Sequence, residues 1–162
     1  MVEMFVYRIA MDQEGQAFVV LMDTTEERML PIVIGPYEAH AIAMVLHGEA
    51  FRRPLTHDLF INTLTACGRQ VRRLEITRLE DSTYYAVLHV TDGRQVVEVD
   101  ARPSDGIALA MRAQAPIYVA EEVLAVAEYR TVAGDDQAEA EQFRELMQRV
   151  RFLEEPEEEE GA

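Results

Sequence analysis

A nine-residue pattern occurs twice in this chain, at Pro36–Met44 and, 67 positions later, at Pro103–Met111. Both copies read proline, any residue, an acid, a small residue, any residue, alanine, an aliphatic residue, alanine and methionine. The agreement extends upstream at the same offset, where Ile9 matches Ile76. Self-similarity at a fixed offset indicates a repeated structural unit, and two units are too few for a stacked solenoid, so the copies are expected to close on each other. The alternative is chance agreement between two alanine-rich helices.

Each copy is expected to contain three strands followed by two helices. Runs rich in β-forming residues predict the strands, and a proline followed by an acid predicts the start of the first helix in each copy. In the first copy the expected strands are 4–11, 17–23 and 28–34, and the expected helices are 36–47 and 57–67, the second after an N-cap at Thr56. In the second copy the expected strands are 71–79, 84–91 and 94–101, the expected helices are 103–113 and 121–129, and 116–119 is an extended link.

This order of elements predicts an α+β domain over residues 1–130, with repeats of roughly 1–68 and 69–130. Six strands are expected to form one strongly curved, mainly antiparallel sheet. No apolar run reaches the roughly 18 residues that span a bilayer, and the N-terminus lacks the basic start of a signal peptide. Because the single Cys67 cannot form an internal disulfide, nothing requires an oxidising compartment. A cytoplasmic protein outside the membrane is therefore expected.

The charge of the chain limits how it can bind nucleic acid. Its formal net charge is −15, from 30 acidic residues and 15 basic ones, all of them arginine. Residues 131–162 hold 11 acids and 3 arginines, which gives −8, so residues 1–130 carry the remaining −7. Avid non-specific binding to duplex nucleic acid relies on many Lys and Arg contacts with phosphates. A nucleic-acid site here is expected to be local, or to be assisted by a cation.

The segment 131–162 has a composition of its own. Apolar residues recur at helical spacing and predict an amphipathic helix over Glu139–Phe152. This helix is expected to dock on the core or on a partner. The run Glu154–Glu160 is acidic and of low complexity, which predicts a disordered tail.

The string Arg53-Pro54-Leu55-Thr56-His57-Asp58-Leu59 contains the first candidate site residues. A histidine beside an aspartate at a helix start can act as a general base or help to hold a cation. A purely structural role competes with this interpretation. Thr56 is expected to cap the helix, and Asp58 lies in its first turn, where the helix dipole favours an anion.

The string Asp100-Ala101-Arg102-Pro103-Ser104-Asp105-Gly106 lies where the last strand of the second copy meets its helix. Free backbone N–H groups at a helix start can bind a phosphate, and acids can hold Mg²⁺, which prefers oxygen ligands. The structural alternative is that Asp105 caps its own helix and that Asp100 pairs with Arg102.

These strings, together with Leu30-Pro31-Ile32-Val33-Ile34-Gly35 and Glu38-Ala39, resemble the bifunctional nuclease domain family over roughly residues 1–130. The resemblance implies two repeats of three strands and two helices that share one barrel-like sheet with the helices outside. It also implies nuclease activity on both RNA and DNA, as proposed for plant members. No settled catalytic set comes with the resemblance, so the site residues are taken from the two polar strings.

The leading hypothesis is a nuclease that hydrolyses phosphodiester bonds of RNA, DNA or both with the help of a divalent cation. Three carboxylates would hold Mg²⁺ or Mn²⁺, which would polarise the phosphate and activate water; they are Asp58, Asp100 and Asp105. A histidine would transfer the proton, so the expected catalytic residues are His57, Asp58, Asp100 and Asp105. Guanidinium groups and a hydroxyl would bind the substrate phosphate; they are Arg53, Arg102 and Ser104.

The alternative hypothesis is a non-enzymatic, homo-oligomeric binding or assembly module. In this interpretation the two polar strings are structural joints, and the acidic C-terminal segment recruits a protein partner. A pocket that binds a small ligand at the strand-to-helix joints is a third interpretation. No P-loop, dinucleotide-binding glycine turn or nucleophile elbow is present, so no organic cofactor is expected.

Overall fold

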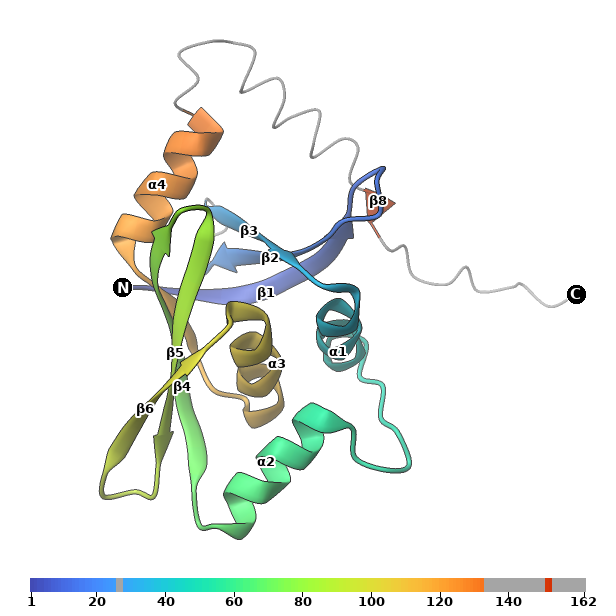
Figure 1. Ribbon diagram of the computed structural model, residues 1–162, viewed down its shortest axis with the longest axis vertical. Coiled ribbons are helices and arrows are strands. Elements are labelled where there is room, and N and C mark those ends of the chain that lie inside the picture. The colour runs from blue at the N-terminus through green and yellow to red at the C-terminus, as the bar shows by residue number, and fades with distance from the viewer. Residues whose placement is uncertain (26–27, 133–150, 153–162) are drawn as a thin grey trace, which may run out of the picture.

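The computed structural model describes residues 1–25, 28–132 and 151–152 (Figure 1). The strands are β1 (Val2–Met11), β2 (Ala17–Asp23), β3 (Met29–Ile34), β4 (Gln70–Glu80), β5 (Thr83–Thr91), β6 (Val96–Ala101), β7 (Ile117–Val119) and β8 (Arg151–Phe152). The helices are α1 (Pro36–Leu46), α2 (Thr56–Ala66), α3 (Pro103–Ala113) and α4 (Glu121–Val132). The expected α+β class is confirmed. No helix among the described residues is long and apolar enough to cross a membrane.

The strands form one mixed sheet in the order β3-β2-β1-β7-β4-β5-β6, and β8 pairs with β1. Its two halves, β1–β2–β3 and β4–β5–β6, are antiparallel. Between them lies β7, which is antiparallel to β1 and parallel to β4, so that Ile117 pairs with both Met4 and Leu74. The expectation that 116–119 is extended is confirmed for Ile117–Val119, but the segment is a strand of the sheet rather than a link. Three residues are too few to show a strand period, and the neighbouring halves decide their conformation.

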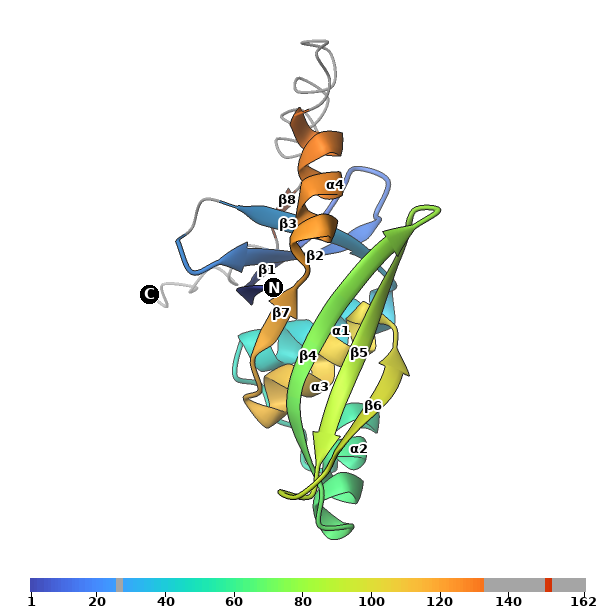
Figure 2. The same ribbon diagram turned by 90° about the vertical axis from the view of Figure 1, so that its left-hand side faces the viewer.

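The sheet does not close into the expected barrel. Strands β3 and β6 stand at opposite ends of the strand order. The two halves of the sheet face in different directions, and α1 and α3 lie in the angle between them (Figure 1, Figure 2). The expectation that the helices lie outside is wrong for α3, because seven of its 11 residues are buried.

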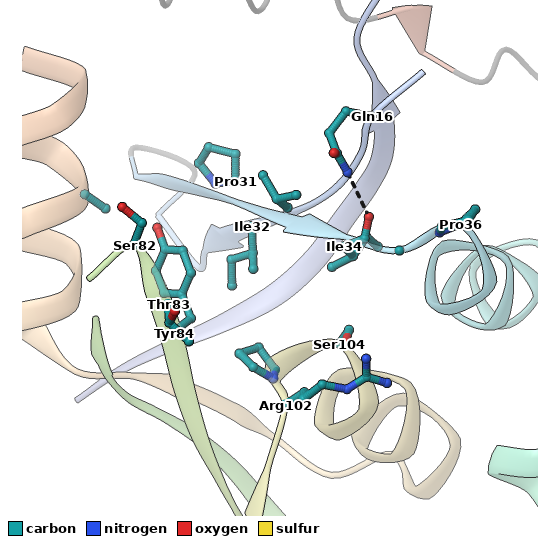
Figure 3. Close-up of a pocket in the computed structure, with 14 residues that line it drawn as sticks. Gln16, Pro31, Ile32, Ile34, Pro36, Ser82, Thr83, Tyr84, Arg102 and Ser104 are labelled. Atoms are coloured by element: carbon teal, nitrogen blue, oxygen red, sulfur yellow. Dashed lines mark hydrogen bonds between the residues drawn. The ribbon is translucent and has the colours of Figure 1, made fainter. Parts of the chain in front are cut away.

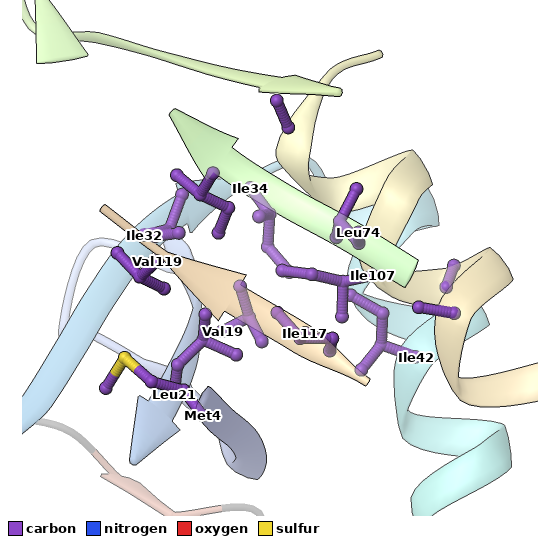
Figure 4. Close-up of a cluster of buried hydrophobic side chains, with 14 of the residues drawn as sticks. Met4, Val19, Leu21, Ile32, Ile34, Ile42, Leu74, Ile107, Ile117 and Val119 are labelled. Atoms are coloured by element: carbon purple, nitrogen blue, oxygen red, sulfur yellow. The ribbon is translucent and has the colours of Figure 1, made fainter. Parts of the chain in front are cut away.

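Glycine at position 106 allows α3 to approach the sheet closely. A Cβ atom there would overlap the fully buried side chain of Leu74 in β4. The core continues from this contact between the helices and the sheet (Figure 4). Its largest fully buried aliphatic side chains are Leu21, Leu30, Ile42, Leu74, Ile76, Leu88 and Ile107. Burial of each such side chain contributes about 1.5–3 kcal/mol relative to exposure to water.

The element bounds recur at the offset of the sequence pattern. Helices α1 and α3 each have 11 residues and begin 67 positions apart, and β3 and β6 each have six residues at the same offset. The halves diverge afterwards, because α2 follows α1 directly, whereas β7 and then α4 follow α3. Each half thus contains the predicted three strands and first helix. Origin by duplication stays a prediction.

Most of the C-terminal segment lies outside the described residues. This applies to the amphipathic helix predicted over Glu139–Phe152, except for its last two residues, and to the acidic run Glu154–Glu160. Arg151 and Phe152 form β8 opposite Met11 and Ala10 of β1, so the helix prediction is wrong for these two residues.

Candidate functional site

Side chains from the N-terminal ends of α1, α2 and α3 meet in a continuous series of ion pairs and hydrogen bonds. The Arg102 Nη2 atom donates to Glu38 Oε1 at 3.0 Å, and Arg102 Nε donates to Asp105 Oδ2 at 2.7 Å. The second oxygen of this aspartate, Asp105 Oδ1, lies 3.3 Å from His57 Nε2. We call these four residues, Glu38, Arg102, Asp105 and His57, the ion-pair chain. It joins the two polar strings, which are distant in the sequence.

Local backbone structure places these groups. Arg102 is the last extended residue before α3, with φ −67° and ψ 141°, and Asp105 lies in the first turn of the helix. Pro103 begins the helix, where its missing N–H costs no hydrogen bond. In α1 the equivalent acid, Glu38, folds back over Gly35, and a Cβ atom at that position would collide with the Glu38 carboxylate. A glycine before α1 therefore leaves room for the carboxylate to reach Arg102.

The start of α2 is stabilised by Asp58. Its Oδ2 accepts the backbone N–H of Leu55 at 2.9 Å, and its Oδ1 accepts Arg112 Nε of α3 at 2.7 Å. The expectation that Thr56 caps this helix is wrong, because Thr56 is already helical and Asp58 supplies the hydrogen bond to the residue before it. The hydrogen bond from the Leu55 backbone, together with Arg112, holds the pKa of Asp58 below its ordinary value. Asp58 thus fixes α2 on α3.

The pKa shifts of Asp105 and Arg102 favour the charged forms of both groups. Partial burial raises the pKa of Asp105, but the hydrogen bonds with Arg102 and His57 outweigh it, and the pKa lies below its ordinary value. Asp105 and Glu38 in turn raise the pKa of Arg102. The Arg102 side chain is 65% exposed. A guanidinium has five N–H donors, two of which are used here, so three are left after the bonds to the two carboxylates.

A cleft of about 900 Å³ opens beside Arg102. It lies between the edge strand β3 on one side and the starts of β5 and α3 on the other (Figure 3). Its polar lining includes Arg102, Ser104, Tyr84 and Gln16, whose Nε2 donates to the Ile34 carbonyl at 3.1 Å. The cleft is where the open sheet leaves a gap between its two halves.

Asp100 is not brought into this site. Its neighbour Ala101 pairs with Ala86, which is fully buried on the core side of β5. Because successive side chains of a strand point to opposite faces, Asp100 points to the other face of the sheet, away from the helices. It is exposed there, opposite Val87. The helical face carries His57 and Asp105, so these three groups do not converge.

The remaining expected groups are distributed unevenly. Ser104 lines the cleft but is buried, and Arg53 is exposed in the loop before α2. The described part of the chain contains no group of three His, Cys, Asp or Glu side chains that could hold a metal ion. The three-carboxylate cation site expected from Asp58, Asp100 and Asp105 is therefore not formed.

Two members of the site were not expected to act there. From the sequence, Glu38 is expected only to mark a helix start and to match the family pattern, and Arg112 has no predicted role. The 67-residue offset between the two copies could have identified Glu38 as a site residue, because it aligns that acid with Asp105. Nothing in the local sequence marks Arg112, since its partner lies 54 positions away.

Comparison with known proteins places the chain in a family. A model of the bifunctional nuclease domain matches residues 19–131, which extend from within β2 to within α4 and include the whole ion-pair chain. The chain belongs to the bifunctional nuclease domain family. The resemblance inferred from the two polar strings is thereby confirmed.

Relatives divide into two groups. A protein of Mycobacterium tuberculosis strain H37Rv, which is described as uncharacterized, is 38% identical over 147 residues, covering 85% of this chain and 87% of the relative. Bifunctional nuclease 1 of Oryza sativa subsp. indica is 25% identical over 70% of this chain and 35% of its own length. Bifunctional nuclease 2 of Arabidopsis thaliana is 26% identical over 64% of this chain and 32% of its own length. The chain thus corresponds to about a third of each plant protein.

Proposed function

We propose that this protein is a nuclease that hydrolyses phosphodiester bonds of RNA, DNA or both. The observation that carries the proposal is the position of Arg102. Its guanidinium is held by Glu38 and Asp105 at the edge of a cleft, with three N–H donors left for a ligand. Asp105 also contacts His57, so a phosphate-binding group and a proton-transfer group share one carboxylate. The family membership and the names of the plant relatives support the same activity.

In the proposed reaction the fork of Arg102 binds the non-bridging oxygens of the phosphate. His57 donates its Nε2–H to Asp105, which leaves the Nδ1 lone pair as the base that takes a proton from water. The water oxygen forms a bond to phosphorus, and the bond from phosphorus to the leaving sugar oxygen breaks. The protonated His57 then returns the proton to that oxygen. The products are a phosphate monoester and an alcohol.

The carboxylates do not fit the expected Mg²⁺ or Mn²⁺ site. Both oxygens of Asp105 contact Arg102 or His57, and both oxygens of Asp58 accept N–H donors. A cation among these groups would meet the positive charges of Arg102 and Arg112. The proposed reaction therefore uses the side chains of Arg102, Asp105 and His57 and no metal ion.

A labelled single-stranded oligonucleotide, as RNA and as DNA, tests the proposal with the purified protein. Arg102→Ala and His57→Ala are expected to lower the rate by about 10²-fold or more, in the range typical of lost electrostatic and proton-transfer groups. Arg94→Ala is the matched control, because Arg94 is an exposed arginine in the β5–β6 turn, outside the ion-pair chain. Equal rates for all three variants and the original protein would exclude this site as the catalytic centre.

A second candidate function, a non-enzymatic assembly module, is favoured by helix α2. None of its residues is buried, and it exposes the large apolar side chains of Leu59 and Phe60. Such a face can recruit a protein partner or a second copy of the chain. Sedimentation of the purified protein tests this function. The assembly module requires a stable oligomer or a stable complex with a partner. It also requires that neither the RNA nor the DNA oligonucleotide is hydrolysed.

A further inference from the structure

Two exposed aromatic residues lie close in the sequence to Glu38 and His57, the two end members of the ion-pair chain. Tyr37 is 86% exposed and immediately precedes Glu38 in the first turn of α1. Phe60 is 44% exposed and follows His57 by three positions in α2, which places both on one side of that helix. We propose that Tyr37 and Phe60 stack against bases on either side of a phosphate bound by Arg102, and that they select single-stranded nucleic acid. This inference rests on the proposed nuclease function.

Packing within the described part of the chain does not explain why these two rings are exposed. Two other tyrosines of the chain have cationic partners, since Arg8 lies 4.0 Å from the ring centre of Tyr7 and Arg78 lies 4.0 Å from that of Tyr85. Within the described residues, Tyr37 and Phe60 have no such cationic partner. An aromatic ring left in water gives up the stabilisation that burial would provide. A ligand that covers both rings would recover it.

The charge of the protein favours a single strand over a duplex as this ligand. Duplex binding depends on many phosphate contacts, and a chain with a net charge of −15 offers few. A single strand exposes the faces of its bases, and stacking on aromatic side chains binds them with little dependence on sequence. Arg102 supplies one exposed positive group in the ion-pair chain, and Arg53 is exposed in the loop just before α2. A surface with few cations and two exposed aromatic rings is suited to bind unpaired bases rather than a duplex.

Fluorescence anisotropy with a labelled, hydrolysis-resistant phosphorothioate strand and its duplex tests the inference on the full chain. Tyr37→Ala and Phe60→Ala are each expected to weaken single-strand binding roughly 5-fold to 150-fold, the range typical of one lost base stack, and Tyr37→Phe is expected to retain binding. Phe5→Ala is the matched control, because Phe5 in β1 is 42% exposed and belongs neither to the ion-pair chain nor to the lining of the cleft beside Arg102. Thermal melting of each variant checks that it is folded.

Cleavage of two oligomers separates this inference from the proposed function. On an abasic oligomer, which has phosphodiesters but no bases, Tyr37→Ala is expected to cleave at the rate of the original protein. On the normal oligomer it is expected to show a raised KM. Unchanged affinity and KM in the alanine variants would overturn the stacking role alone, whereas binding without any hydrolysis would overturn the nuclease alone.

Two further results would also overturn the inference. One is equal binding of the strand and the duplex, or binding of neither. The other is a stable dimer that Phe60→Ala converts to a monomer while nucleic-acid affinity stays the same, which would assign this face to a second copy of the chain.

Discussion

Glu38 and Asp105 hydrogen-bond the same guanidinium, although 67 positions separate them. Arg102 reaches Glu38 Oε1 at 3.0 Å and Asp105 Oδ2 at 2.7 Å. These two acids occupy the same place in the nine-residue pattern that occurs twice in the sequence. The acid of each copy therefore contributes to one shared site, and Arg102 connects the first turns of α1 and α3.

Replacement of Arg102 by lysine is expected to lower the rate of oligonucleotide cleavage almost as much as replacement by alanine, by about 10²-fold. Lysine keeps the charge but presents a compact ammonium, which cannot contact two carboxylates and a phosphate in one plane as a guanidinium does. Steady-state kinetics of the two variants measure the effect. Near-normal activity of the lysine variant would show that charge alone is sufficient.

Gly35→Ala is expected to reduce cleavage to the same extent as Glu38→Ala. The added methyl group would occupy the space of the Glu38 carboxylate and push it away from Arg102. Because both changes remove the same contact, the double variant is expected to be no worse than either single one. Additive losses in this cycle would show that Gly35 acts through something other than Glu38.

The ion pairs of Asp58 and Asp105 are expected to make stability depend on pH in the acidic range. The pKa of each acid lies below its ordinary value of 3.8. An acid of this kind adds stability above its unfolded pKa, and this contribution is lost as the pH falls through the lower folded pKa. Both carboxylates are partly exposed, so each pair contributes less than about 1 kcal/mol.

Urea unfolding of the original protein and of the Asp58→Asn/Asp105→Asn double variant at pH 7 and at pH 3 measures this contribution. The difference in unfolding free energy between the two proteins is expected to shrink at the lower pH. A difference that stays constant would mean that neither carboxylate titrates differently in the folded and unfolded chains.

Gly106→Ala is expected to destabilise the fold by about 1–3 kcal/mol, as overpacking of a core does. The new methyl group would overlap Leu74, which is fully buried and cannot move into solvent. Shortening the neighbour by Leu74→Ala creates space, so the double variant is expected to lose less stability than the two single variants together. Denaturant midpoints of the three variants measure this coupling.

Removal of divalent cations is expected to leave most of the cleavage activity. The acids of the site are held by arginine and histidine, and the described residues hold no three-ligand group for a metal ion. A rate assay with a chelator, and after addition of Mg²⁺ or Mn²⁺, tests this on a preparation free of contaminating nuclease. Complete loss with the chelator would show that the carboxylates exchange their arginine partners for a cation.

The sequence was sufficient to predict those parts of the fold that depend on neighbouring residues. Pro36 and Pro103 begin helices because proline fits the first helical position, and the runs before them form strands because their apolar residues suit a sheet. Repetition of these local signals at one offset also predicted corresponding elements in the two halves. The specific strings around His57 and Asp105 identified the family.

Only the tertiary structure decided which groups meet. His57 contacts Asp105 because α2 lies across α3, and Asp100 is excluded because the strand before α3 turns it to the opposite face of the sheet. The three residues of β7 join the two halves because β1 and β4 offer free edges on either side of them. Local propensity acts over a few residues, whereas these outcomes depend on long-range packing that no short stretch of sequence contains.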